Sequence, residues 1–129
     1  MMKRLILTVL FAVLISGIAF AQQKPAMDFK KTEHNFGIIK EEMDAVSTQF
    51  EFTNTGKKPL VIQDTWASCG CTKPSFAAKP VLPGETGYIS VSYSTVRRPG
   101  TFNKTIKVYT NVPDTVYVLT IKGNVTPRE

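Results

Sequence analysis

Apolar and polar residues alternate along most of the chain. In the segment 46–53 every second residue is Val, Thr or Phe, and in the segment 89–94 apolar residues alternate with serine. The same period of two continues through much of 102–109 and 117–121. A period of two places successive side chains on opposite faces of a strand, and no window shows a sustained helical period. The pattern therefore predicts β-strands that are buried on one face.

Residues that favour turns separate these segments. They cluster at Asn54–Pro59, Pro83–Glu85, Arg98–Gly100 and Asn111–Asp114, and Gly, Pro, Asn and Asp there suit the backbone angles of tight turns. A further strand is expected to begin at Leu60 and run toward Trp66, and a weaker one to cover 29–39. About seven strands in about a hundred residues predict an all-β fold, in which two antiparallel sheets pack face to face.

A core for this sandwich is available from the inward positions of the strands. We expect ten residues to form it, namely Phe36, Phe50, Phe52, Leu60, Ile62, Ile89, Val91, Phe102, Val108 and Leu119. Trp66 stands four residues after Ile62, so a strict period of two puts both on one face. The ring of Trp66 is therefore expected to pack against the sandwich, close to the loop that follows.

The N-terminal segment has the features of an export signal. Lys3 and Arg4 precede a run of sixteen mostly apolar residues, 5–20, which ends at the small-x-small site Ala19–Ala21. A membrane-spanning helix needs about 20 apolar residues, so a cleaved signal peptide (residues 1–21) is favoured over an anchor. We expect the domain to comprise residues 22–129. We also expect it to be exported to the periplasm or secreted, without stable membrane insertion after cleavage.

Charge adds little to this picture. The chain has sixteen Lys and Arg against ten Asp and Glu, a formal net charge of +6, and the signal peptide carries two of the basic residues. The other basic residues occur singly or in pairs and form no block of five or more. No aromatic residues are interleaved with them. A nucleic acid is therefore not expected as a partner.

Both cysteines of the chain lie in one short segment, Cys69–Gly70–Cys71. They could form a reversible disulfide, bind a soft metal, or simply pack a loop against one end of the sandwich. A ring this small constrains the unfolded chain by only about 1.6 kcal/mol, so a bridge is expected to be easily reduced. Gly70, Thr72 and Trp66 are the expected supports of this loop. Pro74 is expected to keep the following residues out of a regular ladder, at a partly exposed end.

Signals for other chemistry are weak. Besides Cys69 and Cys71, the candidate metal ligands are His34, Met27, Met43 and carboxylates, which is a poor signal for a structural zinc site with its four ligands. His34 is the only histidine, and no nucleophile motif accompanies it, so we expect a structural or surface residue. Glu41, Glu42 and Asp44 are expected to be solvated at a hairpin tip. No catalytic residues and no cofactor are assigned.

Several motifs, taken in order, resemble one bacterial family, the domain of unknown function 1573. They are His34–Ile39, Phe50–Ile62, Ser68–Pro74, Pro83–Glu85, Gly100–Lys104, Tyr109–Asn111 and Ile121–Gly123. The resemblance implies an immunoglobulin-like β-sandwich, similar in style to Hydin and major-sperm-protein domains, in an envelope protein. It implies no activity, because fold alone does not carry function.

Two hypotheses for function follow. The first is a non-catalytic binding or structural module that presents sheet edges or end loops to an envelope protein. The alternative is a protein that handles thiols, disulfides or a soft metal through Cys69 and Cys71.

The mature protein should begin at Gln22, because the predicted cleavage site precedes that residue. Intact-mass measurement on the exported protein checks this. A species that retains Met1, or one that stays with the membranes after an alkaline wash, would contradict a cleaved signal.

Overall fold

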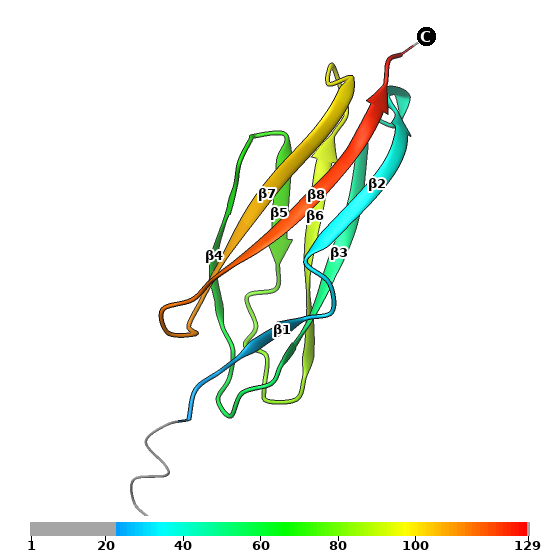
Figure 1. The fold of residues 1–129 in the computed structure, drawn as a ribbon. Coiled ribbons are helices and arrows are strands. Elements are labelled where there is room, and N and C mark those ends of the chain that lie inside the picture. Colours follow the sequence, from blue (N-terminus) through cyan, green and yellow to red (C-terminus); the bar gives the residue numbers. More distant parts are fainter. Residues whose placement is uncertain (1–22, 129) are drawn as a thin grey trace, which may run out of the picture.

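Eight strands in two four-stranded sheets build the part of the chain that the structure describes (Figure 1). The structure is a computed structural model that describes residues 23–128. The predicted signal peptide lies outside the described residues. The strands are β1 (Met27–Phe29), β2 (Glu33–Lys40), β3 (Ala45–Asn54), β4 (Ile62–Ala67), β5 (Thr72–Phe76), β6 (Thr86–Ser94), β7 (Gly100–Thr110) and β8 (Val116–Thr126). The all-β sandwich is confirmed, with one strand more than the expected seven. Within the described residues, no helix is long and apolar enough to cross a membrane.

One strand pairing differs from the prediction of two antiparallel sheets. Sheet A has the order β1-β3-β6-β5 and is antiparallel, whereas sheet B has the order β2-β8-β7-β4. In sheet B, β2 pairs with β8 in parallel, so this sheet is mixed rather than antiparallel. The cause is a change of sheet near the N-terminus, because β1 joins sheet A and β2 joins the opposite sheet.

The predicted hairpin tip at residues 41–44 is wrong for a related reason. β2 and β3 belong to different sheets, and a short 3-10 helix, Glu41–Met43, carries the chain across. Glu41 is buried there rather than solvated, and Arg128 Nε donates to its carboxylate over 3.3 Å. Glu42 and Asp44 are exposed, as expected.

The core lies between the two sheets and largely matches the prediction. Eight of the ten expected residues are buried, and Phe36 and Ile62 are partly buried against them. The core also includes residues outside the expected ten, among them Ile106, Ile121 and Val125. Alternation along each paired strand therefore locates the core well, because both sheets bury one face only.

The residues after the cysteines form a strand, which the sequence argument missed. β5 pairs with β6, and Pro74 stands opposite Val91 in this ladder. A proline cannot donate a ladder hydrogen bond, but β5 is the edge of sheet A, where a missing N–H is tolerated. The expectation that Pro74 excludes a regular ladder is therefore wrong.

Asn54, at the end of β3, is the main polar group in the interior. Its side-chain oxygen accepts from the backbone N–H groups of Gly56 (2.9 Å) and Ala26 (3.3 Å). Its amide nitrogen donates to the backbone carbonyls of Lys58 (2.7 Å) and Val81 (2.9 Å). The residue is fully buried, and all four hydrogen-bonding positions of its amide are used. One side chain therefore joins the N-terminal segment, the β3–β4 turn and the segment before β6.

Asn54→Ala should lower the free energy of unfolding by roughly 2–4 kcal/mol, because it leaves several buried backbone groups without partners. Asn54→Asp is the matched variant: it has nearly the same shape but cannot donate to Lys58 and Val81. Urea unfolding of both variants measures the effect. A loss below about 0.5 kcal/mol in both would show that water replaces these contacts.

Candidate functional site

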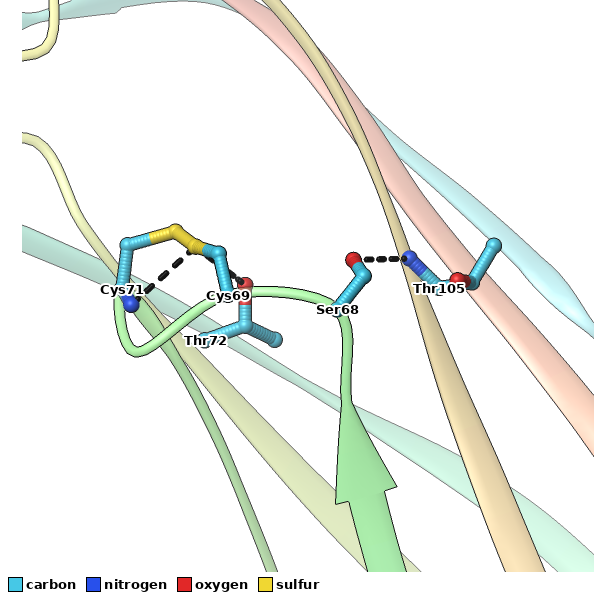
Figure 2. The surroundings of a disulfide bond; sticks show 5 residues. All are labelled: Ser68, Cys69, Cys71, Thr72 and Thr105. Carbon is cyan, nitrogen blue, oxygen red and sulfur yellow. Dashed lines mark hydrogen bonds between the residues drawn. A yellow bond between two sulfur atoms is a disulfide. The ribbon is translucent and has the colours of Figure 1, made fainter.

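The loop between β4 and β5 contains the Cys69–Cys71 disulfide (Figure 2). The two Cα atoms are 5.3 Å apart, so the expectation that the cysteines lie close enough to bridge is confirmed at the level of the structure. The ring closes over a single residue, Gly70. This end of the sandwich is opposite the end that holds the β3–β4 turn (Figure 1).

The two sulfur atoms differ in their surroundings. Cys71 is 3% exposed and belongs to the core, whereas Cys69 is only partly buried. The expectation of a partly exposed site therefore holds for Cys69 but not for Cys71. The cause is that Cys71 directly precedes β5, and its carbonyl already accepts from the backbone N–H of Ser94, at the end of β6, over 2.9 Å.

Thr72 supports the disulfide directly. Its hydroxyl lies 3.9 Å from Cys69 Sγ and 3.7 Å from Cys71 Sγ, and its side chain is buried. The backbone N–H of Cys71 donates to Cys69 Sγ over 3.1 Å (Figure 2). Cys69 Sγ therefore has two polar neighbours, both of which can donate hydrogen bonds to a sulfur that carries negative charge.

Backbone hydrogen bonds hold this loop without help from sulfur. The N–H of Ser68 donates to the carbonyl of Thr105 on β7 over 3.1 Å. The N–H of Thr105 donates back to Ser68 Oγ, also over 3.1 Å (Figure 2). Within the loop, the N–H of Thr72 donates to the carbonyl of Cys69 over 3.2 Å. The loop is therefore tied to both sheets independently of the bridge.

Gly70 does not have the supporting role expected of it. Its φ is outside the left-handed region, and a Cβ at this position would have no heavy atom within 4 Å. The backbone conformation does not require glycine. The residue is exposed, and its lack of a side chain leaves the tip of the loop uncovered.

His34 is not assembled with the cysteines in any cluster of potential metal ligands. Among residues 23–128, no group of three or more His, Cys, Asp or Glu side chains could hold a metal ion. His34 is partly buried on β2, where Lys31 Nζ lies 2.9 Å from its Nδ1 and its ring meets Phe36 edge-on. Burial, followed by the charge of Lys31, lowers the pKa of His34.

Trp66 is not packed against the sandwich, so this expectation is wrong. It does lie near the end of β4, directly before the cysteine loop, but its side chain is 50% exposed. A bulge between Ile62 and Asp64 places two residues of β4 against one step of β7. One extra residue reverses the facing of every later position. Ile62 therefore faces the core and Trp66 faces outward.

The outward turn of Trp66 creates a surface feature that the sequence argument did not identify. Two neighbouring cross-strand rows contain Trp66, Lys107 and Val118, and then Asp64, Tyr109 and Val116. We call these six residues on β4, β7 and β8 the Trp66 face. Lys107 Nζ lies 5.1 Å from the centre of the Trp66 ring. The alternation in 116–118 and 107–109 marks an outward face, but the bulge that adds Trp66 to it has no sequence signal.

Comparison with known proteins connects this chain to a family and to a fold. The family model described as protein of unknown function (DUF1573) matches residues 27–125. No curated protein matches the chain. A protein of unknown function from Porphyromonas gingivalis W83 has a similar structure, with a TM-score of 0.69 and 14% sequence identity. The similarity covers 79% of this chain and 47% of that one.

Two further solved structures share the sandwich. The Vibrio cholerae VesB protease matches with a TM-score of 0.56 and 15% identity, over 83% of this chain and 32% of its own. The Pseudomonas aeruginosa CupB2 chaperone matches with a TM-score of 0.51 and 14% identity, over 78% of this chain and 55% of its own. The chain spans 47% of the length of the Porphyromonas gingivalis protein and 32% of the length of VesB. At such identities the likeness shows a shared fold alone.

Trp66→Ala should reduce the free energy of unfolding by less than about 1 kcal/mol, because a half-exposed ring leaves no cavity when it is removed. Trp66 is the only tryptophan, so the fluorescence of the native protein reports on this face alone. We expect strong quenching by iodide in the folded state. A native protein that iodide does not quench, together with a loss of 3 kcal/mol or more, would mean that the ring is buried.

Proposed function

The chain belongs to the DUF1573 family of proteins of unknown function, and from this premise we propose that it is a non-catalytic binding module of the cell envelope. In this proposal the Trp66 face holds a protein partner whose surface is apolar and acidic. The observation that carries the proposal is the grouping of exposed apolar side chains on one sheet face.

Exposed apolar side chains are grouped on this face. Trp66, Val116 and Val118 are each about half exposed, at 50%, 49% and 48%, and they stand in adjacent cross-strand rows with Tyr109 between them. Single exposed apolar residues need no explanation, but contiguous ones are typical of interaction sites. Trp and Tyr are also enriched among the residues that dominate binding energy.

The Trp66 face contains one acidic residue, Asp64, and one basic residue, Lys107. Asp64 Oδ1 already accepts from the backbone N–H of Thr65 over 2.8 Å, so Lys107 is the charge that favours an acidic group on the partner. Lys107 lies within the apolar rows and, among the described residues, takes part in no ion pair. Its ammonium is held over the Trp66 ring, where a carboxylate from a partner could reach both the charge and the apolar surface. Such a complementary charge adds specificity and speeds association.

Binding through a sheet face fits this fold better than addition of a strand to a sheet edge. β1 is only three residues long. β2 and β4 each contain a bulge. Near these bulges, backbone N–H groups are already bonded to side chains: Gly37 donates to Asn35 and Thr65 donates to Asp64, each over 2.8 Å. β5 contains Pro74, which has no N–H. Short, bulged or proline-containing edges are the usual means of preventing strand addition.

The envelope location in this proposal rests on the predicted signal peptide, residues 1–21. An exported domain meets the proteins of the periplasm and the membrane surfaces.

Photo-crosslinking tests the Trp66 face. A photo-reactive phenylalanine analogue at position 118 should crosslink a protein in the native envelope fraction. The same analogue at position 88 should not, because Tyr88 is equally half exposed but lies on sheet A. Adding Lys107→Glu to the chain labelled at 118 should reduce the adduct at least about tenfold through charge repulsion.

Three outcomes would overturn the proposal. Equal yields at positions 118 and 88 would show that the crosslinks are unselective. An adduct that Lys107→Glu leaves unchanged would remove the role of charge. Adducts of glycan or lipid mass at position 118 would replace the protein partner by another ligand class.

A further inference from the structure

We propose that the Cys69–Cys71 disulfide is a thiol–disulfide exchange site that accepts two electrons from a dithiol, with Cys69 Sγ as the atom attacked. This activity goes beyond the binding function proposed above and uses different residues. It rests on the unequal surroundings of the two sulfur atoms, on the anchoring of the loop and on the open position at Gly70.

Access decides which sulfur reacts. Cys71 is 3% exposed and packs in the core, so an external thiolate has little access to it. Cys69 is partly exposed, and exposed Gly70 beside it presents no side chain that would block an approach. The rate of thiol–disulfide exchange depends on access to the sulfur that is attacked. Attack on Cys69 is therefore favoured.

The exchange takes place in two balanced steps. In the first, a thiolate of the external dithiol bonds to Cys69 Sγ, the Cys69–Cys71 bond breaks, and Cys71 leaves as a thiolate. In the second, the other thiolate of the dithiol attacks its own sulfur in this mixed disulfide and releases the Cys69 thiolate. The external dithiol has become a disulfide, and the two cysteines take up the two protons that it lost.

The surroundings of Cys69 suit it as the leaving group of the second step. The Cys71 N–H lies 3.1 Å from Cys69 Sγ and the Thr72 hydroxyl 3.9 Å from it. Hydrogen bonds to a thiolate lower the pKa of the thiol, and a thiol of lower pKa leaves faster. The Thr72 hydroxyl also lies 3.7 Å from Cys71 Sγ, the sulfur that leaves as a thiolate in the first step. Thr72 is thus a positioning residue for both sulfur atoms in this exchange.

Reduction should not disturb the rest of the domain. The disulfide closes a ring over one residue, so its contribution through chain entropy is small. The loop remains attached to β7 through Ser68 and Thr105 and to the end of β6 through Cys71 and Ser94. A bridge that the fold does not need can cycle between two states, whereas a structural disulfide cannot.

Single cysteine variants of the mature chain test the assignment. Cys71→Ser keeps Cys69, and Cys69→Ser keeps the buried Cys71. After both variants are reduced, Cys71→Ser should form a mixed disulfide with oxidised glutathione at least about tenfold faster than Cys69→Ser. Thr72→Val, introduced into Cys71→Ser, keeps the shape and removes the hydroxyl. It should raise the pH at which the Cys69 thiolate forms, as followed by its ultraviolet absorbance.

The wild-type protein supplies the second measurement. Dithiothreitol, a small dithiol, should reduce the disulfide at a rate that does not depend on low concentrations of urea, and the reduced protein should keep a cooperative melting transition. Equal glutathione rates for the two single variants would overturn the assignment to Cys69. Reduction that proceeds only as fast as global unfolding, or that abolishes the melting transition, would make the disulfide structural.

Discussion

The buried amide of Asn54 is the constraint on which the arrangement of this sandwich depends. A polar side chain in the interior is tolerated only if every hydrogen-bonding position is satisfied. Asn54 meets this condition with four backbone groups from three segments. Its own backbone adds two more bonds, to Gly84 and Glu85. These contacts close one end of the domain, where the chain leaves β3 for the opposite sheet and where Leu60 and Val81 form an isolated bridge.

From this closed end the chain proceeds along β4, which leads to both candidate sites, the Trp66 face and the Cys69–Cys71 disulfide. β4 is the edge of sheet B, and its bulge turns Trp66 outward, onto a face shared with β7 and β8. Three residues later the chain reaches Cys69 in the β4–β5 loop, and this loop lies at the opposite end of the sandwich (Figure 1). Both sites have little freedom to move, because β4 is paired with β7 along its length and the cysteine loop is hydrogen-bonded to β7 through Ser68 and Thr105.

The cysteines have a different role from the staple of antibody domains, which joins the two sheets across the core. Among the residues that the structure describes, fifteen buried apolar side chains, that of Cys71 included, hold the sheets together. Stacking of Tyr93 on Phe102 directly connects sheet A with sheet B. The burial of each large side chain contributes about 1.5–3 kcal/mol. The fold therefore does not depend on the disulfide to hold its sheets together, although the Cys71 side chain is part of the core.

The sequence by itself determined the fold class, most of the core and the closeness of Cys69 and Cys71. These follow from local properties: a period of two along each strand, turn residues between strands, and a spacing of two residues. Tertiary structure alone decided the facing of Trp66, the burial of Glu41 and Cys71, and the strand that contains Pro74. Each of these depends on which strand lies alongside. A one-residue bulge reverses a face, a change of sheet turns an expected hairpin into a crossover, and an edge position lets a proline join a ladder.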